Sequence, residues 1–344
     1  MKALVYHGVH DIRLEDVDRP QLRNGDDVCI RVKAVSICGS DLSGYKGTSK
    51  FRVAPLIMGH EFAGDIAAVG PAVVGIQVGQ RVTVNPSVPC GTCHNCQAGR
   101  RNLCQHRKNV GTTMPAGKYD GAMAEYVCVP AATVIPLPDT LSYEEAALLE
   151  PLGVSLRAVK RAGPLAGEAV AVVGAGPIGL LAMQCAKQLG AATVVGLDVL
   201  DERLETARQC GADLVVNSKR DPVPAVLAVT AHRGVAVAID AVGVSDSVGQ
   251  CLQMVRDAGT IVVIGFAARQ LSLDTFDFVC REITLRGSYT FRGEIEEGME
   301  LAAAGRINLR SMITSVLPLA DGPAVFARLA AGQTSDVKVI LQPT

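Results

Sequence analysis

Four cysteines lie within a short run of the chain, Cys90, Cys93, Cys96 and Cys104. Two residues separate each of the first three from the next, and seven precede the fourth. Thiolates at such spacings can converge on one tetrahedral metal ion, and four sulfurs leave no open coordination position. The run therefore predicts a closed, structural zinc site. Two disulfides would need an oxidising compartment and fit closely spaced cysteines poorly, and ferredoxin-type iron–sulfur spacings differ from this one.

A second set of potential metal ligands lies outside this run. Cys38 follows an apolar AVSI segment, His60 and Glu61 are adjacent in GHEFAG, and Glu150 stands in LLEPLG. Cysteine, histidine and carboxylate are ligand types of catalytic zinc, where three protein ligands leave a place for water or substrate. Singly, a buried cysteine usually packs and a histidine usually forms hydrogen bonds. Together with the cysteine run and a nucleotide-binding pattern, these residues favour a second, reactive zinc.

The nucleotide-binding pattern is the string GAGPIG at residues 174–179, which follows a strand-like run and opens a helical one. The first glycine permits a tight turn, the second lets the backbone approach a pyrophosphate, and the third lets helix pack on strand. Proline is tolerated in a first helical turn, and the free N–H groups there bind phosphates. The expected contacts are Gly174, Gly176, Pro177, Ile178 and Gly179.

Asp198 ends the next strand-like run, close to the distance expected for an acid that binds a ribose 2′-hydroxyl. A carboxylate there repels a 2′-phosphate, so the sequence favours NAD over NADP. Arg203 lies within reach of the same region and leaves NADP open. The plainer interpretation of Asp198 is a helix-capping residue beside a tight turn.

These residues need two kinds of scaffold. The first 150 residues or so contain short extended runs punctuated by Gly, Pro and Asp, which predicts an irregular, mostly antiparallel β domain. From residue 169, apolar strand runs alternate with helical stretches at 177–190, 201–211, after 221 and at 245–258. This alternation predicts a doubly wound parallel sheet. After about residue 290, two helical patches and a strand-like VKVILQ are expected to complete the first domain.

Composition limits the class of protein. Of 344 residues, 49% are hydrophobic but only 4% aromatic, so Val, Ala, Leu and Ile build the core, as suits α/β proteins. A net charge of −1 gives no field that would favour nucleic acid or a membrane surface, and we interpret the basic stretch at 100–108 as a solvated loop. An early charged N-terminus, eleven cysteines and no long apolar segment predict a cytoplasmic protein without a membrane span.

Taken together, these motifs resemble the zinc-dependent medium-chain dehydrogenase/reductase family over essentially the whole chain. The matching segments are GHE with glycines at 64 and 70, ICGSD, the four-cysteine run, VVGAGPIG and EPLG. Within the family, the chain looks most like the polyol, sugar-alcohol and threonine dehydrogenase branches, in which a glutamate at the position of Glu150 replaces the cysteine of liver-type alcohol dehydrogenases.

The resemblance implies an α/β fold with a GroES-like, mostly β catalytic domain at 1–152 and 291–344 and a Rossmann NAD-binding domain at 153–290. The active site would lie in the cleft between domains. Cys38, His60 and Glu150 would bind the catalytic zinc, and Glu61 would exchange with water as a ligand. Two zinc ions per subunit and NAD are the expected cofactors. Further nucleotide contacts are expected at Val242, Ile264, Gly265 and Phe266.

The implied reaction is oxidation of a secondary alcohol to a ketone. Zinc would hold the substrate hydroxyl oxygen and stabilise its alkoxide, and hydride would pass to the nicotinamide. Ser40 matches the relay hydroxyl of the family, although it could also be a simple turn residue. Many relatives have a relay histidine at the position of Ser43, which this chain lacks, so Ser43, Tyr45 or water would have to replace it.

The substrate class is open in the sequence. Residues 43–46, 51, 113–119 and 289–292 are expected to line the cleft, and Arg292 would bind substrate or pair with Glu294. Few aromatics favour a polyol or sugar derivative, with a threonine-like or simple secondary alcohol as the alternative. An inactive NAD-binding sensor and a zinc-free reductase are further alternatives, which the retained ligands disfavour. The partners expected are a small-molecule substrate and further copies of the chain, as a homodimer or homotetramer joined through an apolar edge strand.

Overall fold

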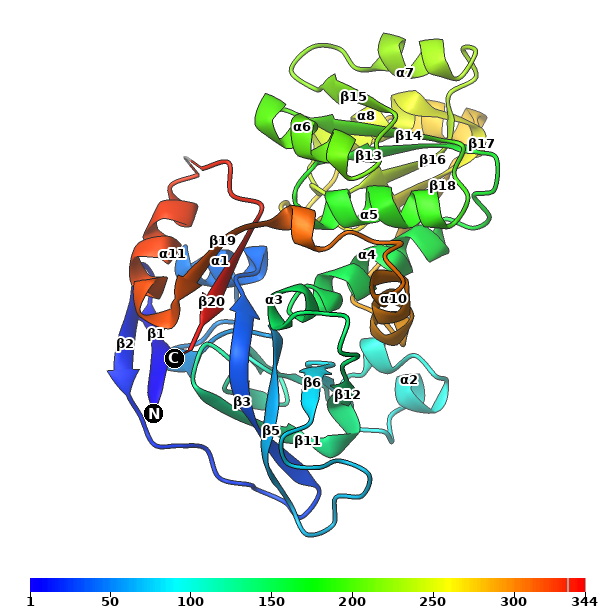
Figure 1. Ribbon diagram of the computed structural model, residues 1–344. Coiled ribbons are helices and arrows are strands. Elements are labelled where there is room, and N and C mark those ends of the chain that lie inside the picture. Colours follow the sequence, from blue (N-terminus) through cyan, green and yellow to red (C-terminus); the bar gives the residue numbers. More distant parts are fainter. Residues whose placement is uncertain (333, 344) are drawn as a thin grey trace. The chain divides into compact units, whose positions relative to one another are not determined.

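The computed structural model describes residues 1–332 and 334–343; Gln333 and Thr344, both in the expected C-terminal part of the catalytic domain, lie outside the described residues. The chain forms two compact units (Figure 1). One unit combines Met1–Glu150 with Ile313–Thr344, and the other is Pro151–Met312. The sequence predicts the second boundary near residue 290, so residues 291–312 belong to the other unit than expected.

The physical reason for this difference is the packing of two helices. Helix α10 (Glu294–Ala303) is joined to α4 (Leu149–Arg161) by an ion pair between Glu294 and Arg157, 3.1 Å apart, and another between Glu297 and Lys160 at 2.5 Å. Neither the strand patterns nor the helical patches in the sequence reveal this pairing, because its partners are far apart in the chain.

The main sheet of the first unit has the order β12-β6-β5-β3-β20-β19, with β11 also paired to β3. Its pairs are antiparallel except β19 with β20. The central strand β3 is buried along most of its length, since its apolar DVCIRVKAVS sequence meets strands on both edges. The C-terminal strand β20 pairs with β3 at Ile340–Ser36 and Leu341–Val35, so the tail completes this sheet. The strands are β3 (Asp27–Ser36), β5 (Glu61–Val69), β6 (Arg81–Val84), β11 (Tyr126–Pro130), β12 (Val134–Pro136), β19 (Ile313–Pro318) and β20 (Lys338–Gln342).

Smaller elements surround this sheet. A three-stranded sheet has the order β2-β1-β4, and two short ribbons pair β7 with β8 and β9 with β10. These elements are β1 (Lys2–Gly8), β2 (Asp11–Asp16), β4 (Leu56–Ile57), β7 (Ser87–Val88), β8 (Lys108–Asn109), β9 (Thr112–Met114), β10 (Gly117–Tyr119), α1 (Gly39–Tyr45), α2 (His94–Gln97), α3 (Tyr143–Ala146) and α11 (Gly322–Ala330), with 3₁₀ turns at Arg101–Leu103, Ala131–Thr133 and Leu319–Asp321.

The second unit is a parallel sheet of order β15-β14-β13-β16-β17-β18. The chain winds outward from β13 in both directions, and in Figure 1 helices α5 and α6 lie over one face of the sheet while α8 lies over the other. This order confirms the predicted doubly wound fold. The elements are β13 (Ala169–Val173), α5 (Pro177–Gln188), β14 (Thr193–Asp198), α6 (Asp201–Gln209), β15 (Leu214–Asn217), α7 (Val223–Val229), β16 (Val235–Asp240), α8 (Ser245–Met254), β17 (Val255–Val263), α9 (Thr275–Cys280), β18 (Thr284–Gly287) and a 3₁₀ turn at Arg310–Met312.

One predicted helix is shorter than expected. The helical pattern at 245–258 ends at Met254, and Val255 already begins strand β17. A C-terminal cap without helical dihedrals at Val255 stops the helix, and the strand then pairs with β16 from Val235 onward. The cores consist mainly of aliphatic side chains, as composition predicts. Within the described residues, no helix combines the length and apolar character that crossing a bilayer requires.

Candidate active site and nucleotide turn

The four cysteines of the run converge in the structure. One ligand atom from each of Cys90, Cys93, Cys96 and Cys104 lies within 4.8 Å of the others. The Sγ atom of Cys104 is 3.5 Å from that of Cys90 and 3.8 Å from that of Cys93. Sulfurs bonded to one tetrahedral zinc at about 2.3 Å stand about 3.8 Å apart, whereas a disulfide requires about 2.05 Å. The geometry therefore fits a closed metal site and not two disulfides.

The electrostatics of this site favour the thiolate at Cys90 but not at Cys96. Hydrogen bonds from the backbone N–H groups of Cys93 and Thr92 lower the pKa of Cys90 to about 5. Burial raises the pKa of Cys96 to about 12, and the neighbouring Cys104 adds to this effect. A cation between the four sulfurs would favour ionisation of every thiol, because the thiolate is the metal ligand.

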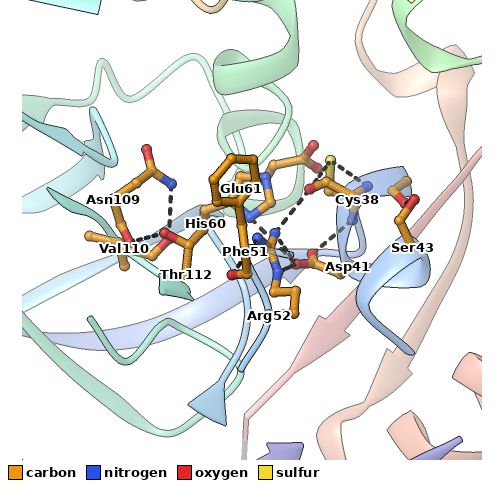
Figure 2. A network of polar contacts seen from close by, with 12 residues as sticks. Cys38, Asp41, Ser43, Phe51, Arg52, His60, Glu61, Asn109, Val110 and Thr112 are labelled. Carbon is orange, nitrogen blue, oxygen red and sulfur yellow. Dashed lines mark hydrogen bonds and ion pairs between the residues drawn. The ribbon is translucent and has the colours of Figure 1, made fainter. Parts of the chain in front are cut away.

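A second ligand cluster lies in the same unit. Cys38, His60 and Glu61 each place one ligand atom within 4.8 Å of the others. Figure 2 shows the three side chains converging from α1 and the start of β5. Among the described residues, the buried Nδ1 of His60 has no hydrogen-bond partner. Soft, intermediate and hard donors around one point fit a zinc ion with an open position.

Local structure places Cys38 at the N-cap of α1. The backbone N–H of Cys38 donates to Asp41 Oδ2 at 3.2 Å, and the backbone N–H of Ser40 donates to Cys38 Sγ at 3.5 Å. This is a capping box with aspartate at its third helical position, so the ICGSD sequence itself begins the helix here. Burial, and next the charge of Glu61, raise the pKa of the Cys38 thiol.

A buried ion pair borders His60 on one side. Asp41 is fully buried, and its Oδ1 accepts hydrogen bonds from Arg52 Nη2 at 2.8 Å and Nε at 3.2 Å. The same oxygen lies 3.6 Å from His60 Nδ1, which is too long for a hydrogen bond. Asp41 therefore borders the imidazole without the hydrogen bond by which carboxylates orient metal-bound histidines. Sequence reasoning missed both residues; the N3 position of the capping box was the available signal for Asp41, and Arg52 had none.

A second buried ion pair holds Glu61. Lys338 Nζ, on strand β20, donates to Glu61 Oε2, and the two side chains are 2% and 1% exposed. Burial would lower the pKa of Lys338, but Glu61 and Cys38 outweigh burial and raise it. Lys338 was not among the site residues expected from the sequence. The available signal was a single lysine within the apolar run VKVIL.

Glu150 lies outside the close cluster of Cys38, His60 and Glu61. Its carboxyl, at the start of α4, is nevertheless near enough to feel their charges: burial raises its pKa to about 7, His60 lowers it, and Glu61 raises it further. The structure thus brings together Cys38, His60 and Glu61, with Glu150 beside them. That Glu150 binds the metal stays a prediction.

The expected proton relay is only partly assembled. The Ser40 hydroxyl donates to Cys38 Sγ at 3.3 Å and accepts from Arg52 Nη2 at 3.0 Å. Ser43 donates to the Gly39 carbonyl of its own helix at 3.1 Å. Tyr45 was one expected replacement for the missing relay histidine, but its ring packs against His10 and Phe326 in the core. A relay role for Tyr45 therefore stays a prediction.

The glycine-rich turn has the predicted form. Gly174, which follows β13, has φ +95°, a left-handed conformation that favours glycine. A Cβ on Gly179 would stand 1.7 Å from the Gly174 carbonyl oxygen, whereas no described atom lies within 4 Å of a Cβ on Gly176. Pro177 is the first residue of α5, beside partly exposed Ile178. The turn therefore leaves the space at Gly176 open, where a pyrophosphate is expected.

The Asp198 carboxylate, expected to bind the ribose, also accepts hydrogen bonds from the backbone. It ends β14 and is buried, and its Oδ2 accepts the Ala175 N–H at 2.7 Å while its Oδ1 accepts the Leu200 N–H at 3.0 Å. Arg203 Nη1 lies 3.9 Å from Oδ2. Asp198 thus fixes the glycine-rich turn to the end of the next strand, which combines the expected nucleotide contact with the plainer capping interpretation.

The remaining expected nucleotide contacts follow the ends of β16 and β17. Buried Asp240 accepts the N–H groups of Val242 and Gly243, and its carbonyl accepts those of Ile264 and Gly265. Phe266 is 77% exposed. The carboxyl ends of adjacent parallel strands meet at one edge of the sheet, so these residues and the glycine-rich turn share that edge.

The expected substrate-lining residues separate by unit. Phe51 and Thr113 are joined in the first unit, where the Thr113 N–H donates to the Phe51 carbonyl at 2.9 Å. Residues 289–292 belong to the second unit. There Glu294 forms an ion pair with Arg157 and accepts a hydrogen bond from the backbone N–H of Arg292. The expected pair between the side chains of Arg292 and Glu294 stays a prediction.

The first unit is mostly β and carries a thiol–imidazole–carboxylate cluster, and the second has a parallel sheet with a dinucleotide-binding turn. This combination defines a metal- and nicotinamide-dependent oxidoreductase. Comparison with known proteins agrees. Residues 24–139 match the model of the alcohol dehydrogenase GroES-like domain, and residues 177–304 match the zinc-binding dehydrogenase model.

Whole-length relatives complete the comparison. The chain is 35% identical to Probable D-xylulose reductase A of Neosartorya fischeri, covering 96% of this chain and 94% of that protein. It is 35% identical to the sorbitol dehydrogenase of Bacillus subtilis, covering 100% and 97%. A zinc-binding dehydrogenase of Sinorhizobium meliloti 1021, solved bound to NADP, superimposes with a TM-score of 0.91 at 32% identity and 99% coverage of each chain. The chain belongs to the zinc-dependent medium-chain dehydrogenase/reductase family and is an NAD(P)-dependent dehydrogenase.

Proposed function

We propose that this enzyme oxidises a secondary alcohol of a polyol, sugar alcohol or related sugar derivative to a ketone, with NAD as acceptor. The observation that carries the proposal is the Cys38–His60–Glu61 cluster with its buried lysine, in a chain whose whole-length relatives are named for xylulose and sorbitol. The substrate class comes from those names, and the dehydrogenase chemistry from the site.

The proposed ligands of the catalytic zinc are Cys38, His60 and Glu150. Glu61, which is paired with Lys338, would exchange with water as a further ligand. A zinc ion bound there would act as a Lewis acid on the substrate hydroxyl. Asp41 borders the His60 imidazole, and Ser40 would accept the substrate hydroxyl proton. A bound nicotinamide would supply the hydride acceptor. Cys90, Cys93, Cys96 and Cys104 would hold the second zinc ion of each subunit, which has no place for substrate.

NAD is the proposed acceptor because of the buried carboxylate of Asp198. A 2′-phosphate beside it would be repelled by the carboxylate. The carboxylate is held in this place because both of its oxygens accept backbone N–H groups. The S. meliloti neighbour was solved with NADP, and Arg203 stands near Asp198 here, so the two cofactors need a direct comparison. We expect a higher kcat/KM with NAD than with NADP.

We further propose a homodimer or homotetramer. Strand β18 ends the order of the parallel sheet within the described part of the chain, and Leu285 on it is 38% exposed. Nearby, Phe276 and Val279 of α9 are 79% and 61% exposed. An apolar strand edge of this kind can pair across a two-fold axis. Leu285→Lys should lower the oligomeric state in analytical ultracentrifugation. A reducing, cytoplasmic compartment is the proposed location, because it keeps the cysteine ligands as thiols.

The direct test is a screen of NAD reduction over polyols, sugars, sugar acids, sugar phosphates, hydroxy amino acids and simple secondary alcohols. We expect turnover with a polyol or sugar alcohol and little with threonine. A preference for threonine or for a simple alcohol would replace the proposed substrate, and NAD binding without turnover on any alcohol would favour a sensor.

The ligand assignment of Glu150 has its own test. Glu150→Ala should lower kcat/KM by about 100-fold or more, because even partners behind the metal ligands cost 10–100-fold. Glu144→Ala is the matched control, since Glu144 lies six residues earlier and accepts a hydrogen bond from Gln342 at 2.6 Å, away from the cluster. Steady-state kinetics and metal analysis of both variants check the expectation; undiminished turnover in Glu150→Ala would show that the assignment is wrong.

A further inference from the structure

Arg52 is the least expected charged group at the candidate site. Its side chain is only 3% exposed, and it comes from the loop before β4. A buried guanidinium must find partners for a fixed fork of N–H donors. Here Nε and Nη2 both reach Asp41 Oδ1, and Nη2 also donates to Ser40 Oγ at 3.0 Å. Figure 2 shows Arg52 beside Asp41, with Cys38 and His60 next to it.

The hydrogen bond to Ser40 restricts what that hydroxyl can do. A serine hydroxyl has one proton to donate and two lone pairs that accept. One lone pair accepts from Arg52, and the proton points to Cys38 Sγ, 3.3 Å away. The second lone pair is therefore the one left for a substrate hydroxyl. The two hydrogen bonds, from Arg52 and to Cys38 Sγ, fix the rotation of the Ser40 hydroxyl.

Arg52 also differs chemically from a relay base. An arginine side chain has no lone pair to offer and stays protonated in proteins, so it cannot take a proton from Ser40. Its charge is already paired with Asp41 Oδ1 at 2.8 Å, so what it contributes to Ser40 is a donor in a fixed direction. Ser43 stands at the position where the relay histidine was expected from the family resemblance. Its hydroxyl donates to the Gly39 carbonyl of its own helix.

The fold makes room for Arg52 in a specific way. A Cβ on Gly44, in the last turn of α1, would stand 2.4 Å from Arg52 Cγ and 2.7 Å from its Cβ. Arg52 can therefore lie against α1 only because residue 44 is glycine. The Gly44 carbonyl is itself fixed by the Tyr6 hydroxyl at 2.9 Å.

We propose that Arg52 is a positioning residue of the proton relay, which holds the Ser40 hydroxyl in place so that its free lone pair can accept from the substrate hydroxyl. With zinc and NAD bound, the substrate hydroxyl proton would pass to Ser40 Oγ as the carbinol carbon loses its hydride. The O–H bond of Ser40 would turn from Cys38 Sγ to solvent, which reaches this half-buried residue, and would give its own proton to water. The products are ketone, NADH and one proton. This inference rests on the proposed function.

The test uses the zinc-loaded, full-length enzyme with its best alcohol from the screen. Arg52→Met should lower kcat by about tenfold or more, with little change in KM. This is less than the roughly 100-fold or more that a proton-transfer group itself contributes, because Ser40 remains. The solvent deuterium isotope effect on kcat should rise, because proton transfer becomes slower relative to hydride transfer. Added to Ser40→Ala, the same substitution should cost less than about threefold more, since the two residues act as a unit.

Two further variants keep the test decisive if Arg52→Met folds poorly with Asp41 left unpaired. Arg52→Lys keeps the charge beside Asp41 but loses the fork, and Gly44→Ala displaces Arg52 without removing any polar group. Both should keep their zinc content and show the same fall in kcat and the same larger isotope effect. Arg81→Lys is the control, because Arg81 is a partly buried arginine of the same unit that holds the carbonyls of Pro138 and Leu141.

Distinct outcomes separate the two proposals. If the unaltered enzyme oxidises no alcohol, the proposed function fails. If it is active, and Arg52→Lys and Gly44→Ala match it in kcat and isotope effect, only the inference about Arg52 fails. Losses that multiply in the Ser40→Ala background, together with a lower zinc content, would overturn it in favour of a purely structural contribution.

Discussion

At the scale of single residues, the site depends on charges removed from water. Two buried ion pairs lie beside the proposed ligands of the reactive zinc. They join Asp41 to Arg52 and Glu61 to Lys338. Buried pairs contribute little net stability, but the loss of one partner is costly because the other charge stays buried. Their value here is placement: one pair borders His60 and Ser40, and the other holds Glu61.

The glycine-rich turn gives a residue-scale prediction. Gly176→Ala should fold normally but bind NAD at least about tenfold more weakly, because a Cβ enters the space kept for the pyrophosphate. Gly179→Ala should instead destabilise the second unit, since its Cβ would collide with the Gly174 carbonyl. Thermal melting with and without NAD separates the two effects. Equal melting and equal NAD affinity for both variants would contradict this account of the turn.

At the scale of elements, α10 is fixed to α4 by Glu294 and Arg157, whose side chains are 10% and 9% exposed. Burial raises the pKa of Glu294, but the backbone N–H groups of Arg292 and Gly293 and the charge of Arg157 outweigh burial and lower it. The carboxylate form is therefore favoured in the folded state. This interaction assigns residues 291–312 to the second unit.

The pH dependence of this contact follows from the sign of the shift. A carboxyl with a lowered folded pKa stabilises the protein above its unfolded pKa of about 4.3, and that stability is lost as pH falls through the folded value. Glu294→Gln should lower the free energy of unfolding by about 2 kcal/mol at neutral pH, as for a hydrogen bond to a charged group, and by less as pH falls below about 4.

Urea denaturation of both proteins at neutral pH and below pH about 4 measures this difference in the free energy of unfolding. Glu297→Gln is the matched control on the same helix face, because its pair with Lys160 is 41% and 44% exposed and should contribute no more than about 0.5 kcal/mol. A loss of stability in Glu294→Gln that is the same at both pH values would argue against a contribution from the ionised carboxylate.

At the scale of the whole molecule, metal chemistry and nucleotide binding are assigned to separate units. Both ligand clusters lie in the unit of Met1–Glu150 and Ile313–Thr344, whereas the glycine-rich turn lies in Pro151–Met312. The four-sulfur site would be closed and the Cys38 site open, so the two proposed zinc ions should differ in how readily they leave.

Metal removal tests this division. Metal analysis should find about two zinc ions per chain, and a chelator should remove one of them, together with activity, well before the other. NAD binding, followed by NADH fluorescence or calorimetry, should persist after the first ion is lost. One tightly held ion with NAD binding and no activity would support a sensor, and activity that resists the chelator would point to a zinc-free reductase.

The sequence by itself determined the features that depend on local spacing. The four cysteines, the capping box at Cys38 and the turn at Gly174 are each made within a few residues, so a short stretch of chain suffices to bring their atoms together. Periodicity likewise determined the parallel sheet, because each strand and helix records its own burial pattern.

Only the tertiary structure decided the contacts between distant segments. Lys338 and Glu61 are 277 residues apart and meet because β20 pairs with β3, beside β5. Arg52 reaches Ser40 because Gly44 leaves room for it, and Asp198 is already bonded to Ala175. Strand register and close packing bring these partners together, and neither is encoded in the spacing of the residues concerned. The four cysteines therefore identify the family from sequence, while the groups that position the reactive site become visible only in the fold.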